Sequence, residues 1–273
     1  MSRVDRYAVF GHPIGHSKSP RIHRLFAEQT GQSIAYTAQD VRPECFDTAV
    51  RVFRAGGGSG LNCTVPLKEL AFRCAEHLTD RARLSGAVNT LWWDDGGSLH
   101  GDNTDGVGLL RDLTGNLHLE LTGRLILILG AGGAARGILG PLLAQRPATL
   151  VIANRTVSRA RELARRFSAL GAVQACGFAE LKGQRFDLVI NATAASLENQ
   201  LPPLPEDLLL PGGVCYDLMY SDQPTAFVRW GLAHGARLSV DGLGMLVEQA
   251  AEAFLRWRGV RPDTRPVIAL LRS

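Results

Sequence analysis

The sequence predicts an α/β fold of two domains, and two observations support that prediction. Short apolar runs, too brief for helices, alternate along the chain with longer stretches of helical pattern. This alternation is typical of strands and helices in a layered α/β protein. The length, 273 residues, leaves room for two modest domains that each bury a core.

The best-defined element is a strand at residues 125–129, five apolar residues that end at Gly130. A short run of this kind is typical of a strand buried on both faces. Gly130, Gly132 and Ala135 then fit the pattern G-x-G-x-x-G/A. The first glycine permits a sharp turn, the second lets the backbone approach a pyrophosphate, and the third position needs a small side chain for packing. The start of the following helix would hold the phosphates. A plain tight turn is the alternative, and the preceding strand favours a dinucleotide site.

The next predicted strand, residues 149–153, indicates which dinucleotide binds. An NAD site usually places an acidic residue about 20 residues beyond the glycines, on the ribose hydroxyl. Here the strand is followed by Asn154, Arg155 and Thr156, with Arg159 after them. A guanidinium pairs with a 2′-phosphate, which a carboxylate would repel. The sequence therefore favours NADP, and the alternative is a solvated basic helix face.

Composition excludes several classes of protein. The formal net charge is only +4, without a basic run, so nothing argues for nucleic acid as a partner. No apolar stretch approaches a membrane span, and the first residues are polar and charged. Five cysteines, an odd number without a C-x-x-C pair, indicate a reducing compartment and no metal site. We expect a cytoplasmic protein with a small anionic substrate and no membrane partner.

The first part of the chain predicts further α/β elements. Residues 11–20 form a loop rich in Gly and Pro, built for a defined shape. Ser19 is expected to cap the helix that begins with Pro20, whereas Ser17 has no such local role. The alternative is that both hydroxyls hold the carboxylate or hydroxyls of a small ligand. Pro66 ends a strand, so that Lys68 projects from the loop or helix start that follows. We expect strands at 7–10, 34–41 and 87–91, a helix at 43–55, and a hairpin over 94–97 that returns through 99–101.

The second part begins after a polar segment bracketed by glycines, residues 101–106, which is the expected domain border. Further strands are predicted at 186–191, 213–218 and 237–240. A last amphipathic helix over 245–257 places Met245 and Gln249 on one face.

Proton transfer to or from a carbinol would need a titratable side chain, for which the residues alone leave several candidates. They include Lys68, Asp105, Tyr220 and several histidines. An isolated lysine is more often a surface residue, and an isolated aspartate at a helix start is more often a cap. Residue chemistry alone does not choose among them.

Seven motifs in a constant order resemble those of shikimate dehydrogenases and cover nearly the whole chain. The segment from Asn62 to Lys68 is similar to the family signature N-V-T-x-P-x-K. The other matches are G-x-P-x-x-H-S-x-S-P at 11–20, G-A-V-N-T at 86–90, G-x-N-T-D-G at 101–106, G-A-G-G-A at 130–134, N-R-T at 154–156 and D-G-L-G-M-L at 241–246.

This resemblance implies a reversible, NADP-dependent reduction of 3-dehydroshikimate to shikimate in aromatic amino-acid biosynthesis. It implies that Lys68 and Asp105 are the catalytic pair. The residues implied to bind substrate are Ser17, Ser19, Thr64, Lys68, Asn89, Asp105, Tyr220 and Gln249. Those implied to bind cofactor are Asp80, Gly130, Ala131, Gly132, Gly133, Ala134, Asn154, Arg155, Thr156, Arg159, Thr193, Leu218, Gly242 and Met245.

The resemblance also implies an N-terminal α/β substrate domain and a Rossmann-type NADP-binding domain, with a deep cleft between them. The substrate domain would be discontinuous, 1–105 plus 241–273, with 106–240 as the NADP domain. A monomer or a homodimer fits equally well. Two alternatives stay open: a quinate/shikimate dehydrogenase that uses NAD, and a non-catalytic sensor of NADP(H) or shikimate.

Three departures from the family pattern are visible. His12 stands where Asn is usual, and Cys63 replaces a common Val as an apolar filler. Residues 191–196 read N-A-T-A-A-S where N-A-T-S-x-G is frequent, which could alter cofactor affinity. None of these changes removes a residue implied in the chemistry.

Overall fold

The computed structural model describes residues 4–193, 195 and 200–272, and it divides into two compact units. The first unit is Met1–Gly108 together with Val247–Ser273, and the second is Leu109–Leu246. The chain passes from one unit to the other within helices α5 (Asp105–Arg111) and α9 (Leu243–Arg258). The first unit is therefore discontinuous in sequence.

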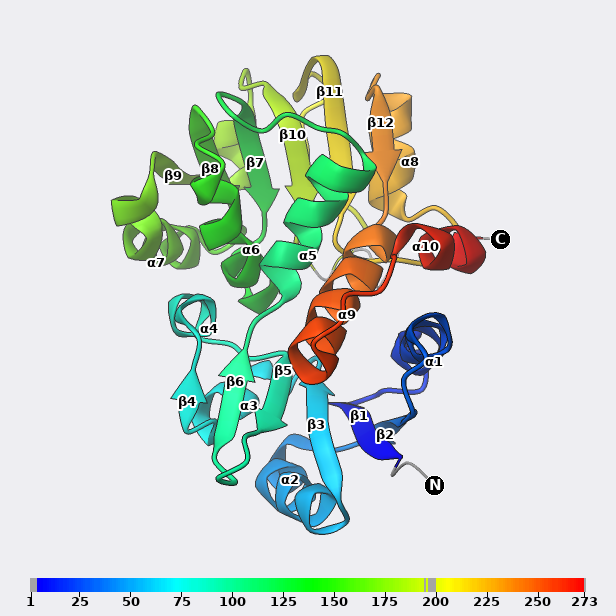
Figure 1. Ribbon diagram of the computed structural model, residues 1–273. Coiled ribbons are helices and arrows are strands. Elements are labelled where there is room, and N and C mark those ends of the chain that lie inside the picture. Colours follow the sequence, from blue (N-terminus) through cyan, green and yellow to red (C-terminus); the bar gives the residue numbers. More distant parts are fainter. Residues whose placement is uncertain (1–3, 194, 196–199, 273) are drawn as a thin grey trace. The chain divides into compact units, whose positions relative to one another are not determined.

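The first unit is built on a six-stranded mixed sheet with the order β2-β1-β3-β5-β6-β4 (Figure 1). β1 pairs in parallel with β2 and with β3, whereas β5 runs antiparallel to both β3 and β6. Because β1 and β3 are parallel neighbours, the loops that follow them emerge at the same edge of the sheet. The strands are β1 (Asp5–Gly11), β2 (Ile34–Asp40), β3 (Gly58–Cys63), β4 (His77–Leu78), β5 (Thr90–Trp93) and β6 (Leu99–Asp102).

Helices cover this sheet and bury its apolar side chains. Phe46, Val50 and Phe53 lie on one stripe of α2 and join Ala71 of α3 in the core over Phe10 and Leu61. The three α2 residues are spaced by three and four, which places them on one helix face. The helices are α1 (Ser19–Thr30), η1 (Pro43–Cys45), α2 (Phe46–Ala55), α3 (Lys68–Cys74), α4 (Asp80–Ser85), α5, α9 and α10 (Arg265–Arg272).

The second unit has a six-stranded, wholly parallel sheet with the order β12-β11-β10-β7-β8-β9 (Figure 1). Numbered within the unit, this is the order 6-5-4-1-2-3 of a Rossmann fold. Its strand order reverses between β7 and β10, where such folds bind their ligands. The strands are β7 (Leu125–Leu129), β8 (Thr149–Ala153), β9 (Val173–Cys176), β10 (Phe186–Asn191), β11 (Leu209–Asp217) and β12 (Leu238–Val240).

The strands of the second unit bury their side chains on both faces, as their continuous apolar runs predict. Ile126, Leu127, Ile128 and Leu129 of β7 are all fully buried. The helices and short turns of this unit are η2 (Asp112–Asn116), α6 (Gly133–Ala144), α7 (Val157–Phe167), η3 (Ser168–Leu170), η4 (Phe178–Leu181) and α8 (Ala226–Ala233).

Three strand predictions are confirmed at the predicted bounds, namely 125–129, 149–153 and 186–191. The prediction of a strand over 87–91 is only partly right, because β5 begins at Thr90. Residues 87–89 are buried in a loop, where the Val88 amide donates to the Lys68 carbonyl and the Asn89 amide to the Asp102 carbonyl. Ala87 and Val88 are apolar because they are buried, and a short buried loop cannot be told from a strand by its apolar residues alone. The helix predicted over 43–55 begins with a 3-10 turn, η1, before α2.

The prediction that Ser19 caps α1 is wrong. The residue at the cap position is Lys18, and Ser19 is the first residue of the helix. It is instead Ser17 that bonds to the backbone, since its Oγ accepts the Ser19 amide at 3.3 Å. The difference amounts to one residue, which is the usual uncertainty of a helix end.

Candidate active site

The first unit brings Lys68 and Asp105 together as an ion pair. Lys68 Nζ lies 2.5 Å from Asp105 Oδ2, and the two side chains are 24% and 8% exposed. A turn in which the Leu67 amide donates to the Thr64 carbonyl separates β3 from α3, so that Lys68 begins the helix. Asp105 is the first residue of α5. Residues that are 37 positions apart thus form one charged pair that solvent can still reach through the lysine.

Asn89 connects this pair to α9. Its side-chain amide lies 2.8 Å from Asp105 Oδ1, 2.9 Å from Thr104 Oγ1 and 3.2 Å from Gln249 Oε1. Asn89 Oδ1 in turn accepts the backbone amide of Thr104 at 2.9 Å. Lys68 therefore holds one oxygen of Asp105 and Asn89 the other, which fixes the plane of the carboxylate.

Three residues that bond to Asn89 or to its partners were missed in the sequence analysis. Asn62 donates to the Asn89 carbonyl and to Thr90 Oγ1, and its own oxygen accepts the Tyr36 hydroxyl at 2.7 Å. Thr104 lies between Asn89 and Gln249. Asn62 and Thr104 stand inside the motifs, so their positions were a usable signal. Tyr36 lies on β2 outside the motifs, and the neighbouring sequence does not indicate a role for it.

The loops that follow β1 and β3 carry the three predicted hydroxyls. Backbone bonds join these loops, from the Thr64 amide to the Phe10 carbonyl and from the His12 amide to the Val65 carbonyl. Ser17 and Ser19 lie after β1, and Thr64 lies after β3. Ser17 and Thr64 belong to adjacent loops at one sheet edge and Ser19 begins α1, all in the same unit as Lys68 and Asp105. His12, the departure in this loop, pairs with Asp40 at 2.6 Å.

The second unit presents the glycine-rich loop at the reversal of strand order, between the ends of β7 and β10. Gly130 has φ of +103°, and a Cβ there would lie 3.0 Å from the Ala192 carbonyl oxygen, so a side chain is disfavoured twice. At Gly132 and Gly133, by contrast, no atom of the described residues lies within 4 Å of the position that a Cβ would take. These glycines lead into α6, whose first amides have no partner within the helix and whose N-cap has no side chain. Open space in front of free amides fits the pyrophosphate of NADP.

The residues after β8 are placed to meet the adenosine ribose. The Asn154 side chain donates to the Thr156 carbonyl at 2.9 Å and shapes the turn into α7. Arg155 and Arg159 are exposed, and within the described part of the chain neither guanidinium forms an ion pair. No acidic residue occupies the turn. This arrangement fits a 2′-phosphate.

The residues predicted to line the nicotinamide lie at the ends of β10 and β11 and at the start of α9. Thr193 donates its amide and its hydroxyl to Asn191 Oδ1. A Cβ on Gly242 would lie 2.4 Å from the Leu218 carbonyl oxygen, which requires glycine there. The Met245 amide donates to the Tyr216 hydroxyl at 3.2 Å. In the departure at 191–196, Ala194 and Ser196 lie outside the described residues.

Two predicted residues lie in a different unit from the rest of their group. Asp80, predicted on the cofactor side, belongs to the first unit, where it is exposed and pairs with Arg83 at 2.8 Å. Tyr220, predicted on the substrate side, belongs to the second unit. Within each unit taken by itself, Asp80 is therefore not placed beside the other predicted cofactor residues, nor Tyr220 beside the other predicted substrate residues.

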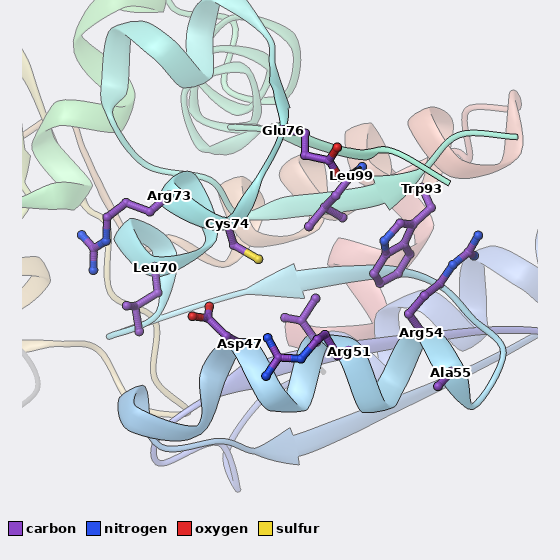
Figure 2. Close-up of a pocket in the computed structure, with 11 residues that line it drawn as sticks. Asp47, Arg51, Arg54, Ala55, Leu70, Arg73, Cys74, Glu76, Trp93 and Leu99 are labelled. Carbon is purple, nitrogen blue, oxygen red and sulfur yellow. Dashed lines mark hydrogen bonds between the residues drawn. The ribbon is translucent and has the colours of Figure 1, made fainter. Parts of the chain in front are cut away.

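A separate cavity of about 610 Å³ opens between α2 and α3 (Figure 2). None of the predicted site residues lines it. Arg51 and Asp47 border it from α2, and Arg73 borders it from α3. Arg54 lies over the ring of Trp93 at 5.0 Å and so occupies one side. Charges of both signs line this groove. Among the described residues, no cluster of side chains could hold a metal ion, and no helix has the length and apolarity needed to cross a bilayer.

Three family comparisons match successive parts of the chain. "Shikimate dehydrogenase substrate binding domain" matches residues 9–91, "Shikimate / quinate 5-dehydrogenase" residues 112–199, and "Shikimate 5'-dehydrogenase C-terminal domain" residues 242–272. A protein from Methylococcus capsulatus named shikimate dehydrogenase (NADP(+)) is 64% identical over 100% of this chain and 98% of its own length. The chain belongs to the shikimate dehydrogenase family. The resemblance found in the seven motifs is thereby confirmed.

Other shikimate dehydrogenases and solved structures agree with this membership. The NADP(+)-named shikimate dehydrogenase of Alkalilimnicola ehrlichii is 60% identical over 98% of this chain and 99% of its own. The Thermus thermophilus shikimate 5-dehydrogenase, solved in complex with NADP(H) and shikimate, has a TM-score of 0.88 and 34% identity, covering 98% of this chain and 99% of its own. An Ael1 enzyme from Pseudomonas putida has a TM-score of 0.91 and 47% identity, with 98% of each chain covered. The predicted two-domain α/β class, with a Rossmann-type unit, is confirmed.

Proposed function

We propose that this protein is an NADP-dependent shikimate dehydrogenase that reversibly reduces 3-dehydroshikimate to shikimate. The observation that carries the proposal is the Lys68–Asp105 pair, 2.5 Å apart and held from the other side by Asn89. A lysine next to a carboxylate, open to solvent on one side, is suited to moving a hydroxyl proton. Membership of the shikimate dehydrogenase family supports shikimate as the alcohol, because curated relatives that are 64%, 60% and 58% identical carry that name.

In the direction of oxidation, the reaction removes a proton from the substrate hydroxyl and a hydride from the carbon that bears it. The Lys68 ammonium of this pair first releases a proton to solvent, and the neutral Nζ then accepts the proton of the substrate hydroxyl. Asp105 orients that amine and stabilises the ammonium that forms. NADP⁺, when bound, accepts the hydride. In the direction of reduction, the same Lys68 returns the proton to the carbonyl oxygen.

Substrate binding is assigned to the polar residues of the first unit. Ser17 and Ser19 would hold the carboxylate, and Thr64, Asn89 and Gln249 the ring hydroxyls. Tyr220 would add a further hydroxyl from the second unit. Recognition of a polyhydroxylated acid by a site with fixed donors strongly rejects analogues that lack a matching hydroxyl.

Cofactor binding is assigned to the second unit. The loop of Gly130, Ala131, Gly132, Gly133 and Ala134 would take the pyrophosphate. Asn154, Arg155, Thr156 and Arg159 would take the phosphorylated ribose, and Thr193, Leu218, Gly242 and Met245 the nicotinamide. Asp80 would contribute on the cofactor side from the first unit.

The domain roles, location and assembly are parts of the same proposal. Residues 1–105 with 241–273 would form the substrate domain, and 106–240 the NADP domain. The five free cysteines support a reducing cytoplasm as the site of action. The enzyme would act there as a monomer or a homodimer.

The test is an absorbance assay of the purified protein with shikimate or quinate, each with NADP⁺ or NAD⁺. Reduced nicotinamide is expected with shikimate and NADP⁺, and little in the other three mixtures. Comparable rates with quinate or NAD⁺ would assign the protein to the quinate/shikimate type. A folded protein that binds NADP⁺ without turnover in any mixture would contradict the proposal and favour a sensor.

A further inference from the structure

An arginine outside the predicted site clamps the segment that carries Asp105. Asp102 lies three residues before Asp105 and is fully buried. Arg81 of α4 donates to both of its carboxylate oxygens, from Nε at 2.7 Å and from Nη2 at 2.5 Å. The Thr79 hydroxyl adds a third bond at 2.6 Å. Burial by itself would raise the pKa of the Asp102 carboxyl, but the hydrogen bonds and charge of Arg81 outweigh it and lower that pKa.

Asp102 passes this constraint along the backbone to Asp105. Its Oδ1 accepts the Asn103 amide at 2.7 Å. Asn103 Oδ1 in turn accepts the Asp105 amide at 3.1 Å, while its side-chain nitrogen donates to Ser85 Oγ and to the Ala87 carbonyl. Each bond fixes the next residue, so the start of α5 has little freedom as long as Asp102 is held.

The same guanidinium also reaches α9. Arg81 Nη1 and Nη2 lie 3.3 and 3.2 Å from Glu252 Oε1. Glu252 is three residues after Gln249, which lies one turn earlier on the helix and contacts Asn89. The other Glu252 oxygen accepts a bond from Arg261 at 2.9 Å. The charged network continues from Arg261 to Glu248 at 2.7 Å, and Arg256 lies 4.0 Å from Asp102.

We propose that Arg81 is a positioning residue that fixes the position of Asp105 relative to Gln249. One guanidinium holds the segment of the catalytic carboxylate through Asp102 and the helix of a substrate-binding amide through Glu252. Bidentate geometry suits this task, because a planar fork fixes orientation as well as distance. Arg81 is 26% exposed in its side chain, and its guanidinium bonds to Asp102 and Glu252, neither of which is assigned to substrate. This inference rests on the proposed function.

The test compares Arg81→Met with Arg258→Met in shikimate oxidation. Arg258 is the matched control: it lies on α9 in the same unit, is 18% exposed and pairs with Asp5 at 2.5 Å, remote from the assigned residues. Both variants are expected to lose stability. Only Arg81→Met should lower kcat about tenfold or more and raise the KM for shikimate, with the KM for NADP⁺ unchanged. Arg81→Lys should recover part of the loss, because one ammonium keeps the charge but not the fork.

A second variant keeps the inference testable if Arg81→Met does not fold. Glu252→Gln leaves the Arg81–Asp102 pair in place and weakens the bonds of Glu252 to Arg81 and to Arg261. The KM for shikimate should therefore rise about threefold or more, with some loss of stability. Folded Arg81→Met with kcat and KM values like those of Arg258→Met would overturn the inference and leave the proposed function intact. Unchanged KM in Glu252→Gln would overturn the link through α9. A wild-type protein without shikimate turnover would contradict the proposed function itself, and the inference with it.

Discussion

The two units carry their assigned residues in opposite ways. In the first unit, side chains around Asp105 bond to one another. Asn89 is 2% exposed and bonds to Asp105, to Gln249 and to the fully buried Thr104. In the second unit the glycine loop presents bare backbone, and Arg155 and Arg159 are exposed. The first site is a network of bonded side chains, and the second combines the start of a helix with exposed arginine side chains.

This difference follows from what each ligand requires. A hydride and a proton must leave one defined carbon and oxygen, so the groups that meet the substrate need fixed orientations. A dinucleotide is long and highly charged, and backbone amides at a helix start satisfy its phosphates without side-chain order. Substitutions in the first unit should therefore change turnover, whereas those in the second should change cofactor affinity.

The largest effect is expected from Lys68→Ala. Removing the proton-transfer group should lower kcat by roughly 10²- to 10⁴-fold with little change in KM for shikimate, because the proton moves in the transition state. Steady-state kinetics would measure it. Lys182→Ala, at an exposed turn of the second unit, is the control and should behave like the wild type. Turnover of Lys68→Ala at the wild-type rate would refute the assignment.

Gly132→Val should affect only the cofactor. No atom of the described residues would meet its Cβ, so the melting temperature should change little, but the side chain would fill the position assigned to the pyrophosphate. We expect the KM for NADP⁺ to rise about tenfold or more. Gly130→Val is the contrasting variant: its φ of +103° and its close Ala192 carbonyl predict a loss of stability. Equal losses of stability in the two variants would contradict the distinction between a glycine needed for the cofactor, Gly132, and one needed for the backbone conformation, Gly130.

Arg155→Ala should have a smaller and more selective effect. Loss of one charged hydrogen bond to a 2′-phosphate is expected to weaken NADP⁺ binding about tenfold. NAD⁺ has no such phosphate, and its affinity should stay nearly unchanged. Calorimetric titration with both dinucleotides would measure the ratio. An equal loss for both would show that Arg155 does not read the phosphate.

The last effect is expected on stability, not on turnover or cofactor binding, and it comes from His23. This residue is fully buried and stacks on Tyr36 with 4.1 Å between ring centroids, and burial lowers its pKa to about 3. The unfolded chain binds a proton at a pKa of about 6.5, so stability falls as pH drops below that value. Between pH 7 and pH 5 the loss should be about 2 kcal/mol.

His23→Leu should remove that dependence, as urea unfolding at the two pH values would measure. Asp102 does not interfere in this range, because its lowered pKa keeps it charged at pH 5. A variant with the same loss between pH 7 and pH 5 as the wild type would contradict the role of His23.

The two sites also differ in how much of each could be predicted from the sequence. The glycine loop could be predicted from physical chemistry, because a strand, a turn and a helix start are local and Gly130 needs its unusual φ. Lys68 and Asp105 are 37 residues apart and meet only through the fold, so a resemblance to the family was needed to select them. Arg81 was not predicted at all, since its partners Asp102 and Glu252 lie 21 and 171 residues away. Ser19 shows the remaining limit, an error of one residue in a helix start.

The most direct test of the separate-site account is calorimetric titration of shikimate and of NADP⁺, each alone, into Gln249→Ala and Gly132→Val. The account predicts a crossed result: Gln249→Ala weakens shikimate and keeps NADP⁺, whereas Gly132→Val weakens NADP⁺ and keeps shikimate. Comparable losses for both ligands in either folded variant would contradict the division of binding between the two units.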